Sequence, residues 1–152
     1  MENLSIAPAD EAHAAVLSAL HERCFAGLPE TPWSETAMRT VLRMPGVDAW
    51  VACDADGEPC GLLVGRATGG DGEILTVCVM PEHRRRGVAR ALFDAFLARL
   101  PSAHRLVLEV AIDNEPAIAL YMSLDFRPAG RRPGYYPGAS ERVDALILAR
   151  ET

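Results

Sequence analysis

The segment from Glu73 to Leu100 constrains the fold more than any other part of the chain, because a strand, a tight turn and a helix follow one another in it without a gap. Residues 73–80 are apolar almost throughout, which is typical of a central strand buried on both faces. From Val88 onward, apolar residues fall on one helical stripe until Pro101 ends the pattern. The segment therefore favours a layered domain in which helices flank a sheet.

The rest of the chain extends this pattern in both directions. Further strands are expected at 4–7, 47–53, 61–68, 106–111, 126–130 and 143–150, and further helices at 10–24, 34–44 and 114–124. A hairpin closed by the turn at 54–57 precedes the alternating strands and helices, and a loop rich in Gly, Pro and Tyr separates the last two strands. We therefore predict an α/β fold of the mixed α+β type, as a single domain over residues 1–152.

Charge and composition exclude several functions. The net charge of -6 disfavours binding to nucleic acid or to an anionic membrane. All 15 basic residues are arginine, which rules out a P-loop lysine, a Schiff-base lysine and a Ser-Lys dyad. The four cysteines form no C-x-x-C pair and are expected as reduced core thiols of a cytoplasmic protein, and no metal site is expected. We also expect no secretory leader and no membrane-spanning run.

The turn between the central strand and its helix carries the clearest chemistry. The run from Arg84 to Arg90 opens the helix, and a helix N-terminus presents unpaired N–H groups and the positive end of a dipole. Gly87 and the small Ala89 let the backbone approach an anion closely. A basic turn can also be a solvated face. Because strand, glycine, small residue and helix occur together, we favour a pyrophosphate site.

Two blocks of the chain resemble the GNAT acetyltransferase superfamily. The pattern R-x-x-G-x-A at 84–89, directly after the central strand, is similar to the family's acyl-CoA signature. The second block joins the Leu-Glu-Val strand at 108–110 to the pattern N-x-x-A-I-A-L-Y-x-S-L-x-F at 114–126. The resemblance implies a central mixed, mostly antiparallel sheet of six to seven strands flanked by about four helices.

Two shorter segments are similar to one branch of this family. Pro32-Trp33-Ser34-Glu35 and Tyr135-Tyr136-Pro137 resemble the ribosomal-protein-alanine N-acetyltransferases, which acetylate the α-amine of a protein N-terminus. That branch usually has glycine at the position of Asp125. The helix before it would end in a left-handed conformation, which Asp adopts at modest cost.

The resemblance implies that acetyl-CoA is the cosubstrate. Family members bind the CoA pyrophosphate through backbone amides of the turn. They pair the pantetheine arm with the preceding strand, in a groove where the strands carrying Val79 and Glu109 splay apart. Asn114 would contact the cofactor arm, cap its helix, or do both. The implied cofactor-binding residues are Val77, Cys78, Val79, Arg85, Arg86, Gly87, Val88, Ala89, Arg90 and Asn114.

Glu109 and Tyr121 are the implied catalytic pair. Glu109 is the only charged residue in its strand at 106–111, so we expect a partly buried carboxylate whose pKa is raised toward the working range of a general base. A surface glutamate is the alternative, and the match to the family block favours function. Tyr121 lies two helical turns after Asn114, and its phenol can donate a proton to a departing thiolate. Its alternative role is that of a core aromatic.

Trp33, Tyr135 and Tyr136 are the implied acceptor-binding residues. In the branch that the chain resembles, tyrosines in this loop hold the first residues of a peptide. The alternative is that the two tyrosines cover the end of the sheet. Trp33 is interpreted either as a wall of the acceptor channel or as a staple between helices.

Three functions fit these observations. The first is an acetyl-CoA-dependent Nα-acetyltransferase that acts on a protein N-terminus, such as that of a basic ribosomal protein, by direct attack in a ternary complex. The second is an N-acetyltransferase of a small-molecule amine or amino acid. The third is a non-catalytic acyl-CoA-binding module, against which the presence of Glu109 and Tyr121 argues. The aromatic loop favours a peptide acceptor, and we expect a monomer or weak dimer.

Overall fold

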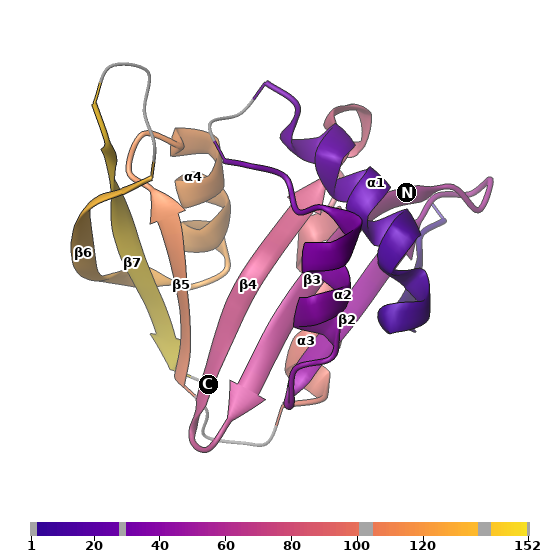
Figure 1. Cartoon of the computed structure of the whole chain (residues 1–152), viewed down its shortest axis with the longest axis horizontal. Helices are drawn as coiled ribbons and strands as arrows, with labels where there is room; N and C mark the ends of the chain where they lie inside the picture. Colours follow the sequence, from indigo (N-terminus) through magenta and orange to yellow (C-terminus); the bar gives the residue numbers. More distant parts are fainter. Residues whose placement is uncertain (1–2, 28–29, 101–104, 137–140, 152) are drawn as a thin grey trace.

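Seven strands form one sheet in the computed structural model, which describes residues 3–27, 30–100, 105–136 and 141–151 (Figure 1). The strands lie in the order β1-β2-β3-β4-β5-β7-β6. Their bounds are β1 (Ser5–Ala9), β2 (Val47–Cys53), β3 (Pro59–Thr68), β4 (Asp71–Val79), β5 (Arg105–Ala111), β6 (Arg127–Tyr136) and β7 (Val143–Glu151). The helices are α1 (Ala14–Phe25), α2 (Glu35–Leu42), α3 (Val88–Ala98) and α4 (Glu115–Ser123), with short 3-10 turns at Glu11–His13 and Pro81–His83.

The mixed, mostly antiparallel sheet expected from the sequence is confirmed. Every neighbouring pair of strands is antiparallel except β4 and β5. These two are parallel, and they pair only where Asp71–Glu73 lies beside Arg105–Val107. Beyond this short ladder β4 and β5 diverge, as Figure 1 shows. The sheet therefore opens between the halves of β4 and β5 that carry Val79 and Glu109.

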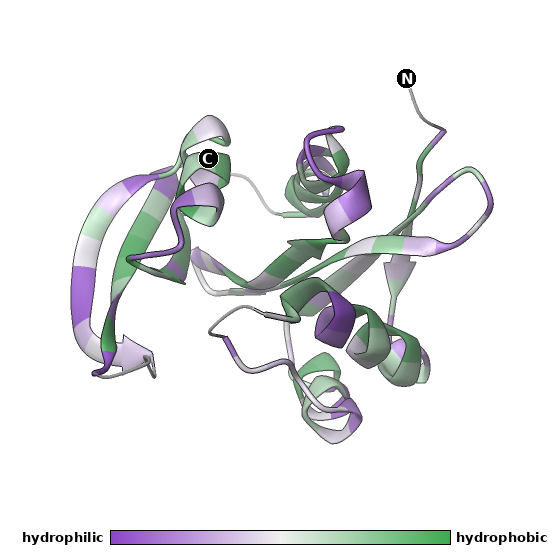
Figure 2. Ribbon diagram, turned by 90° about the horizontal axis from the view of Figure 1, so that it is seen from above, coloured by the Kyte–Doolittle hydropathy of each residue, from purple (hydrophilic) through white to green (hydrophobic). Residues whose placement is uncertain are grey.

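Helices cover both faces of the sheet. On one face, α1 and α2 pack over a buried cluster that includes Leu17 and Met38. On the other face, α3 and α4 pack over a larger cluster that includes Phe96 and Phe126. Figure 2 shows apolar sides of the helices turned toward the sheet. Full burial of one such side chain contributes roughly 1.5–3 kcal/mol, so these two clusters hold the layers together.

The two edge strands differ from their expected bounds. β1 covers Ser5–Ala9 rather than 4–7, and β6 runs from Arg127 to Tyr136 rather than ending at 130. Both strands contain prolines, and Pro133 of β6 falls in the segment that the sequence predicts to be a loop. Proline is tolerated at an edge because one side of the strand needs no ladder partner. Irregular pairing between Arg132 and Tyr136 also accommodates the Pro-Gly pair within β6.

This extension of β6 corrects the predicted position of the two tyrosines. Tyr135 and Tyr136 lie at the end of β6, not in a loop, and Tyr136 is paired with Val143 of β7. Pro137, the third residue of that motif, lies outside the described residues, as does Pro101 after α3.

α4 ends in a left-handed residue, as the sequence comparison with the family predicts. Asp125 has φ 71°, its N–H donates to the carbonyl of Met122 at 3.1 Å, and the Phe126 N–H donates to the carbonyl of Tyr121 at 3.1 Å. These two bonds form a Schellman motif, which needs a left-handed residue after the helix. The motif turns the chain so that Phe126 enters the core.

Replacing Asp125 with glycine is expected to stabilise the protein by on the order of 0.5 kcal/mol, because glycine adopts positive φ without steric strain. The gain is small because glycine also loses more backbone entropy on folding. Thermal unfolding measures the change as a rise in Tm. Asp113→Gly is the matched control, since Asp113 does not have positive φ. A fall in Tm for Asp125→Gly as large as that for Asp113→Gly would contradict this account.

Candidate active site

A cleft of about 580 Å³ lies along the far half of β4, on the side where β5 has diverged, and none of its described lining residues comes from β5. Its walls come from the end of α1, the far half of β4, the turn before α3, and α4. Nine of the ten expected cofactor residues line it, namely Val77, Cys78, Val79, Arg85, Gly87, Val88, Ala89, Arg90 and Asn114. Arg86 belongs to the same turn but is not among the lining residues. Residues expected from three separate parts of the chain thus meet in one place.

The turn before α3 has the backbone shape of an anion site. Arg85 and Gly87 both adopt left-handed conformations, with φ 63° and 82°. Gly87 is the N-cap of α3, contributes no side-chain cap, and accepts the first helical hydrogen bond from Ala91 at 3.0 Å. The first N–H groups of an α-helix have no partner within the helix, so those of α3 are available at the cleft. Left-handed turn residues gather such N–H groups into a concave site for oxyanions.

The edge of β4 that faces β5 is open along the cleft. β3 pairs with the other edge of β4 as far as Val79, whereas the ladder with β5 ends at Glu73. An open strand edge can accept an extended group through backbone hydrogen bonds. Arg84, the first residue of the basic run before α3, closes the end of this edge. Its Nε donates to the carbonyl of Val79 at 3.1 Å, and its Nη2 donates to the carbonyl of Cys24 at 3.2 Å.

Asn114 caps α4 and also reaches across the cleft. Its Oδ1 accepts from the N–H of Ala117 at 3.3 Å, which confirms the N-cap interpretation. Its Nδ2 donates to Oε1 of Glu30, at 3.3 Å, in the connection between α1 and α2. The other carboxylate oxygen of Glu30 is buried and has no hydrogen-bond partner among the described residues. The sequence gives no signal for Glu30, because an isolated glutamate in a Gly/Pro-rich loop resembles a surface residue.

Glu109 lies at the centre of a small polar network between β5 and β6. Its side chain is 25% exposed, and Oε1 accepts a hydrogen bond within an ion pair from Nε of Arg132. The Tyr135 side chain also hydrogen-bonds to Glu109, and the negative charge of Glu109 raises the pKa of Tyr135. The Arg132 guanidinium lies 5.7 Å from the centre of the Tyr135 ring. Glu109 is therefore partly buried, as expected, but sequence analysis missed its arginine partner.

Tyr136 adjoins this network through Tyr135, and Tyr121 lies close to Tyr136. Burial raises the pKa of Tyr121, with smaller contributions from Cys78, Tyr136 and Glu30. Burial likewise raises the pKa of Tyr136 to about 12, and the charges of Glu30 and Glu109 add to this shift. Both phenols therefore keep their protons through the neutral range. Tyr121 also contacts Phe126 edge to face, with ring centroids 6.0 Å apart, so it has both a core contact and a polar end near the site.

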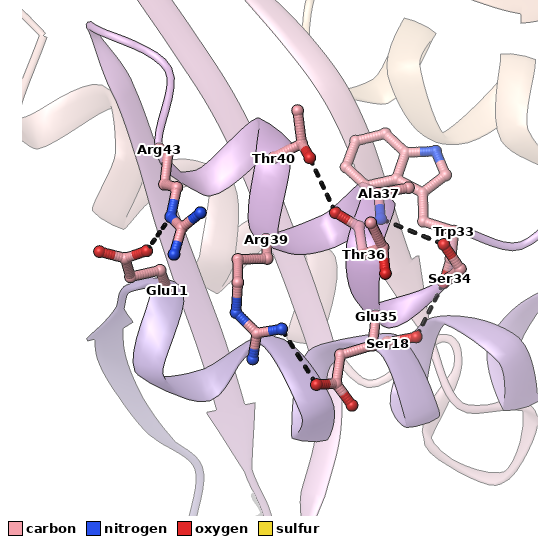
Figure 3. A network of polar contacts seen from close by, with 10 residues as sticks. All are labelled: Glu11, Ser18, Trp33, Ser34, Glu35, Thr36, Ala37, Arg39, Thr40 and Arg43. Atoms are coloured by element: carbon pink, nitrogen blue, oxygen red, sulfur yellow. Dashed lines mark hydrogen bonds and ion pairs between the residues drawn. The ribbon is translucent and has the colours of Figure 1, made fainter.

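Trp33 is fixed to α1 by two hydrogen bonds. The backbone carbonyl of Trp33 accepts from Oγ of Ser18 at 2.8 Å. Its backbone N–H donates to Nδ1 of His21 at 3.1 Å. Figure 3 shows the Ser18 bond beside the cap of α2, where Oγ of Ser34 accepts from Ala37 at 3.1 Å. The indole stacks on the His21 ring, with centroids 5.2 Å apart. These contacts support the helix-staple interpretation, and a role as channel wall stays a prediction.

His21 is buried and neutral. Because Nδ1 accepts from Trp33, the ring proton is on Nε2, which donates to Oγ1 of Thr76 at 3.0 Å. Burial lowers the pKa of His21 from 6.5 to about 4. In the unfolded chain His21 gains a proton below pH 6.5, whereas the folded protein resists protonation down to about pH 4. Its stabilising contribution is therefore complete above pH 6.5 and declines as the pH falls toward 4.

We expect the free energy of unfolding to fall between pH 6.5 and pH 4 with a slope that depends on His21. Urea unfolding across this range measures the slope. It should become shallower in His21→Gln, because the buried neutral ring is then absent. Equal slopes in the native protein and His21→Gln would refute the assignment.

Two further surveys apply to the described part of the chain. It holds no group of three or more His, Cys, Asp or Glu side chains suited to a metal ion. None of its helices combines the length and apolar character needed to cross a membrane.

The chain belongs to the acetyltransferase (GNAT) family, whose model matches residues 15–126. It is 40% identical over 78 residues to the [ribosomal protein bS18]-alanine N-acetyltransferase of Escherichia coli K12, covering 50% of this chain and 53% of that protein. It is 35% identical over 82 residues to an N-alpha-acetyltransferase of Saccharolobus solfataricus. That match covers 52% of this chain and 47% of the relative. The chain thus spans about half the length of these curated relatives.

The fold is similar to that of solved family members. The crystal structure of the ribosomal-protein-S18-alanine N-acetyltransferase from Escherichia coli superimposes with a TM-score of 0.85. The match covers 98% of this chain and 94% of that structure, at 26% sequence identity. The family and fold expected from the two sequence blocks are therefore confirmed.

Proposed function

We propose that the protein transfers an acetyl group from acetyl-CoA to the α-amine of a protein N-terminus, such as that of a ribosomal protein, by direct attack in a ternary complex. The observation that carries the proposal is the cleft along the open edge of β4, with the left-handed turn before α3 at one end; the Glu109 network lies on the strand that diverges from β4. The names of the relatives support an α-amine acceptor. The free thiols suit a cytoplasmic protein, and we propose that it acts as a monomer or weak dimer.

The residues along the cleft fit acetyl-CoA. The turn from Arg85 to Arg90 would hold the pyrophosphate through backbone N–H groups, and the open edge of β4 at Val77–Val79 would pair with the pantetheine arm. Asn114 borders the same space from α4. Acetyl-CoA supplies a thioester, whose carbonyl carbon is open to attack by a neutral amine.

Glu109 would act as the general base. A free α-amine has a pKa of about 7.7–8.0, whereas that of lysine is about 10.4, so a carboxylate removes a proton more easily from the α-amine. Arg132 and Tyr135 hold the Glu109 carboxylate from the β6 side. Tyr121, which burial keeps protonated, would give its phenolic proton to the sulfur that leaves.

The acceptor would enter beside Tyr135 and Tyr136, with Trp33 across the channel. Tyr135 is 48% exposed, and its ring meets Tyr136 edge to face with centroids 4.9 Å apart. The net charge of -6 favours the approach of a basic protein. This arrangement suits an extended peptide with a small first residue.

Thiol release from acetyl-CoA tests the proposal. The acceptors are a peptide that begins with alanine, the same peptide with its α-amine blocked and an internal lysine retained, and a panel of small amines. We expect rapid release only with the free α-amine. Thiol release with small amines alone would favour a small-molecule N-acetyltransferase. Binding of acetyl-CoA without thiol release from any acceptor would favour a non-catalytic acyl-CoA-binding module.

Tyr121→Phe is expected to lower kcat by roughly tenfold to a hundredfold, because the leaving thiolate loses its proton donor. Acetyl-CoA should still raise the Tm of this variant, since the cleft residues remain in place. Tyr136→Phe makes the same chemical change and should act mainly on the KM of the peptide. Unchanged kcat in Tyr121→Phe at saturating peptide would show that Tyr121 is a core aromatic only.

A further inference from the structure

Two cysteines from distant parts of the chain meet at the wall of the cleft. Cys24 lies in the last turn of α1, Cys78 lies near the end of β4, and both border the cleft. Their side chains share a hydrogen bond. In the apo protein Cys24 is 2% exposed and Cys78 is 9% exposed, so the cleft is the route by which a reagent reaches them.

The crossing of α1 over β4 holds these thiols together. One helical turn earlier, His21 bonds to Thr76 across the same interface at 3.0 Å. Residues three apart share a helix face, and residues two apart share a strand face. The His21–Thr76 and Cys24–Cys78 contacts are therefore successive steps of one register, which fixes the thiol pair without any flexible loop.

The two thiols differ in reactivity. The hydrogen bond from Cys78 lowers the pKa of Cys24, and the charges of Arg84 and Arg23 add to this effect against burial and the opposing charge of Glu82. The hydrogen bond with Cys24 and burial raise the pKa of Cys78 well above its usual range. A thiol with lowered pKa attacks disulfides as its thiolate, and a neighbouring thiol resolves the mixed disulfide after it has given up its own proton.

We propose that Cys24 and Cys78 form a reversible dithiol site that reacts with the disulfide of coenzyme A bound in the cleft. The contact between the thiols is independent of the proposed function, whereas the choice of CoA disulfide rests on it. The anion site at α3 would bind the nucleotide end and bring the sulfur end toward β4. Cys78 also lies close enough to Tyr121 to raise the pKa of the phenol, which places the pair near the sulfur that Tyr121 would protonate.

The reaction consists of two exchanges. The Cys24 thiolate attacks one sulfur of CoA disulfide, the S–S bond breaks, and one CoA thiolate leaves and takes a proton. The Cys78 thiol then loses its proton and attacks the Cys24 sulfur of the mixed disulfide. The second CoA thiolate leaves with that proton. The protein thus loses two electrons and two protons, and one CoA disulfide becomes two CoA thiols.

The test uses the folded, full-length chain with CoA disulfide or with hydroxyethyl disulfide, which has no anionic end. Remaining thiols are alkylated, and peptide mapping by mass spectrometry locates the linked cysteines. We expect a Cys24–Cys78 disulfide that forms at least about tenfold faster with CoA disulfide, because binding in the cleft raises the local concentration of the reagent. Acetyl-CoA should slow the reaction, and dithiothreitol should reverse it.

Variants separate the two roles. Cys78→Ser should stop the reaction at a CoA adduct on Cys24. Cys24→Ser should give neither the adduct nor the disulfide. Cys53→Ser on β2 is the matched control and should react as the native protein does. A pair that stays reduced with both reagents overturns the proposal. Equal rates with both reagents overturn the assignment of CoA disulfide. If acetyl-CoA causes no Tm shift but hydroxyethyl disulfide oxidises the pair, the dithiol site is supported and the proposed function is contradicted.

Discussion

Glu109→Gln is expected to lower turnover at saturating acceptor by roughly a hundredfold or more, which is the usual effect of removing a general base. Glutamine keeps the shape of the side chain and an oxygen that can accept from Arg132. It lacks the negative charge and the basicity that remove a proton from the amine. The fold should therefore survive while the chemistry is lost.

The pH dependence of kcat separates loss of a base from general damage. The deficit of Glu109→Gln should shrink above about pH 8, where an α-amine is already largely neutral. Glu151→Gln at the end of β7 is the control, because Glu151 pairs with Arg105 at the exposed end of the sheet. A Glu109→Gln enzyme with native turnover at neutral pH would remove Glu109 from the acid–base mechanism.

Gly87→Val is expected to abolish the rise in Tm that acetyl-CoA produces. A ligand that binds only the folded state at a hundred times its Kd stabilises a protein by about 2.7 kcal/mol, so the native shift is measurable. Gly87 has φ 82°, which a β-branched residue avoids. The turn would relax and move the N–H groups of α3 away from the anion.

Gly57→Val provides a matched control for this substitution. Gly57 has φ 79°, and a Cβ at either glycine would meet no atom within 4 Å, so both substitutions cost strain rather than a clash. Each variant should lose on the order of 1–2 kcal/mol of stability. Only Gly87→Val should lose the response to acetyl-CoA, because Gly57 lies in the turn between β2 and β3. A normal shift in Gly87→Val would place the cofactor elsewhere.

Local sequence patterns predicted most of the fold and the strand, turn and helix start that line the cleft. The apolar strand, the glycine turn and the amphipathic helix depend on neighbours in sequence, and so does the capping of α4 by Asn114. The family pattern also identified Asp125 as a helix-ending residue, and its φ of 71° confirms this. Such features are set by backbone conformation and side-chain periodicity, which a single sequence displays.

Features that depend on pairing between distant segments could not be predicted. Arg132 meets Glu109 only because β7 lies between β5 and β6 and sets their register. Glu30 reaches Asn114 across 84 positions of the chain. The prolines of β6 indicated a loop because the sequence does not show that this strand is at an edge. The missed residues are thus those whose partners are chosen by tertiary structure.

The position of the transferred acetyl group tests the central claim most directly. The protein is incubated with acetyl-CoA and a peptide that has an N-terminal alanine and one internal lysine, and tandem mass spectrometry locates the product. The chain contains no lysine, so acetylation of the protein itself cannot supply a lysine-linked signal. We predict acetyl on the α-amine of the peptide. Acetylation confined to the lysine, or turnover of small amines without any peptide product, would contradict the proposed function.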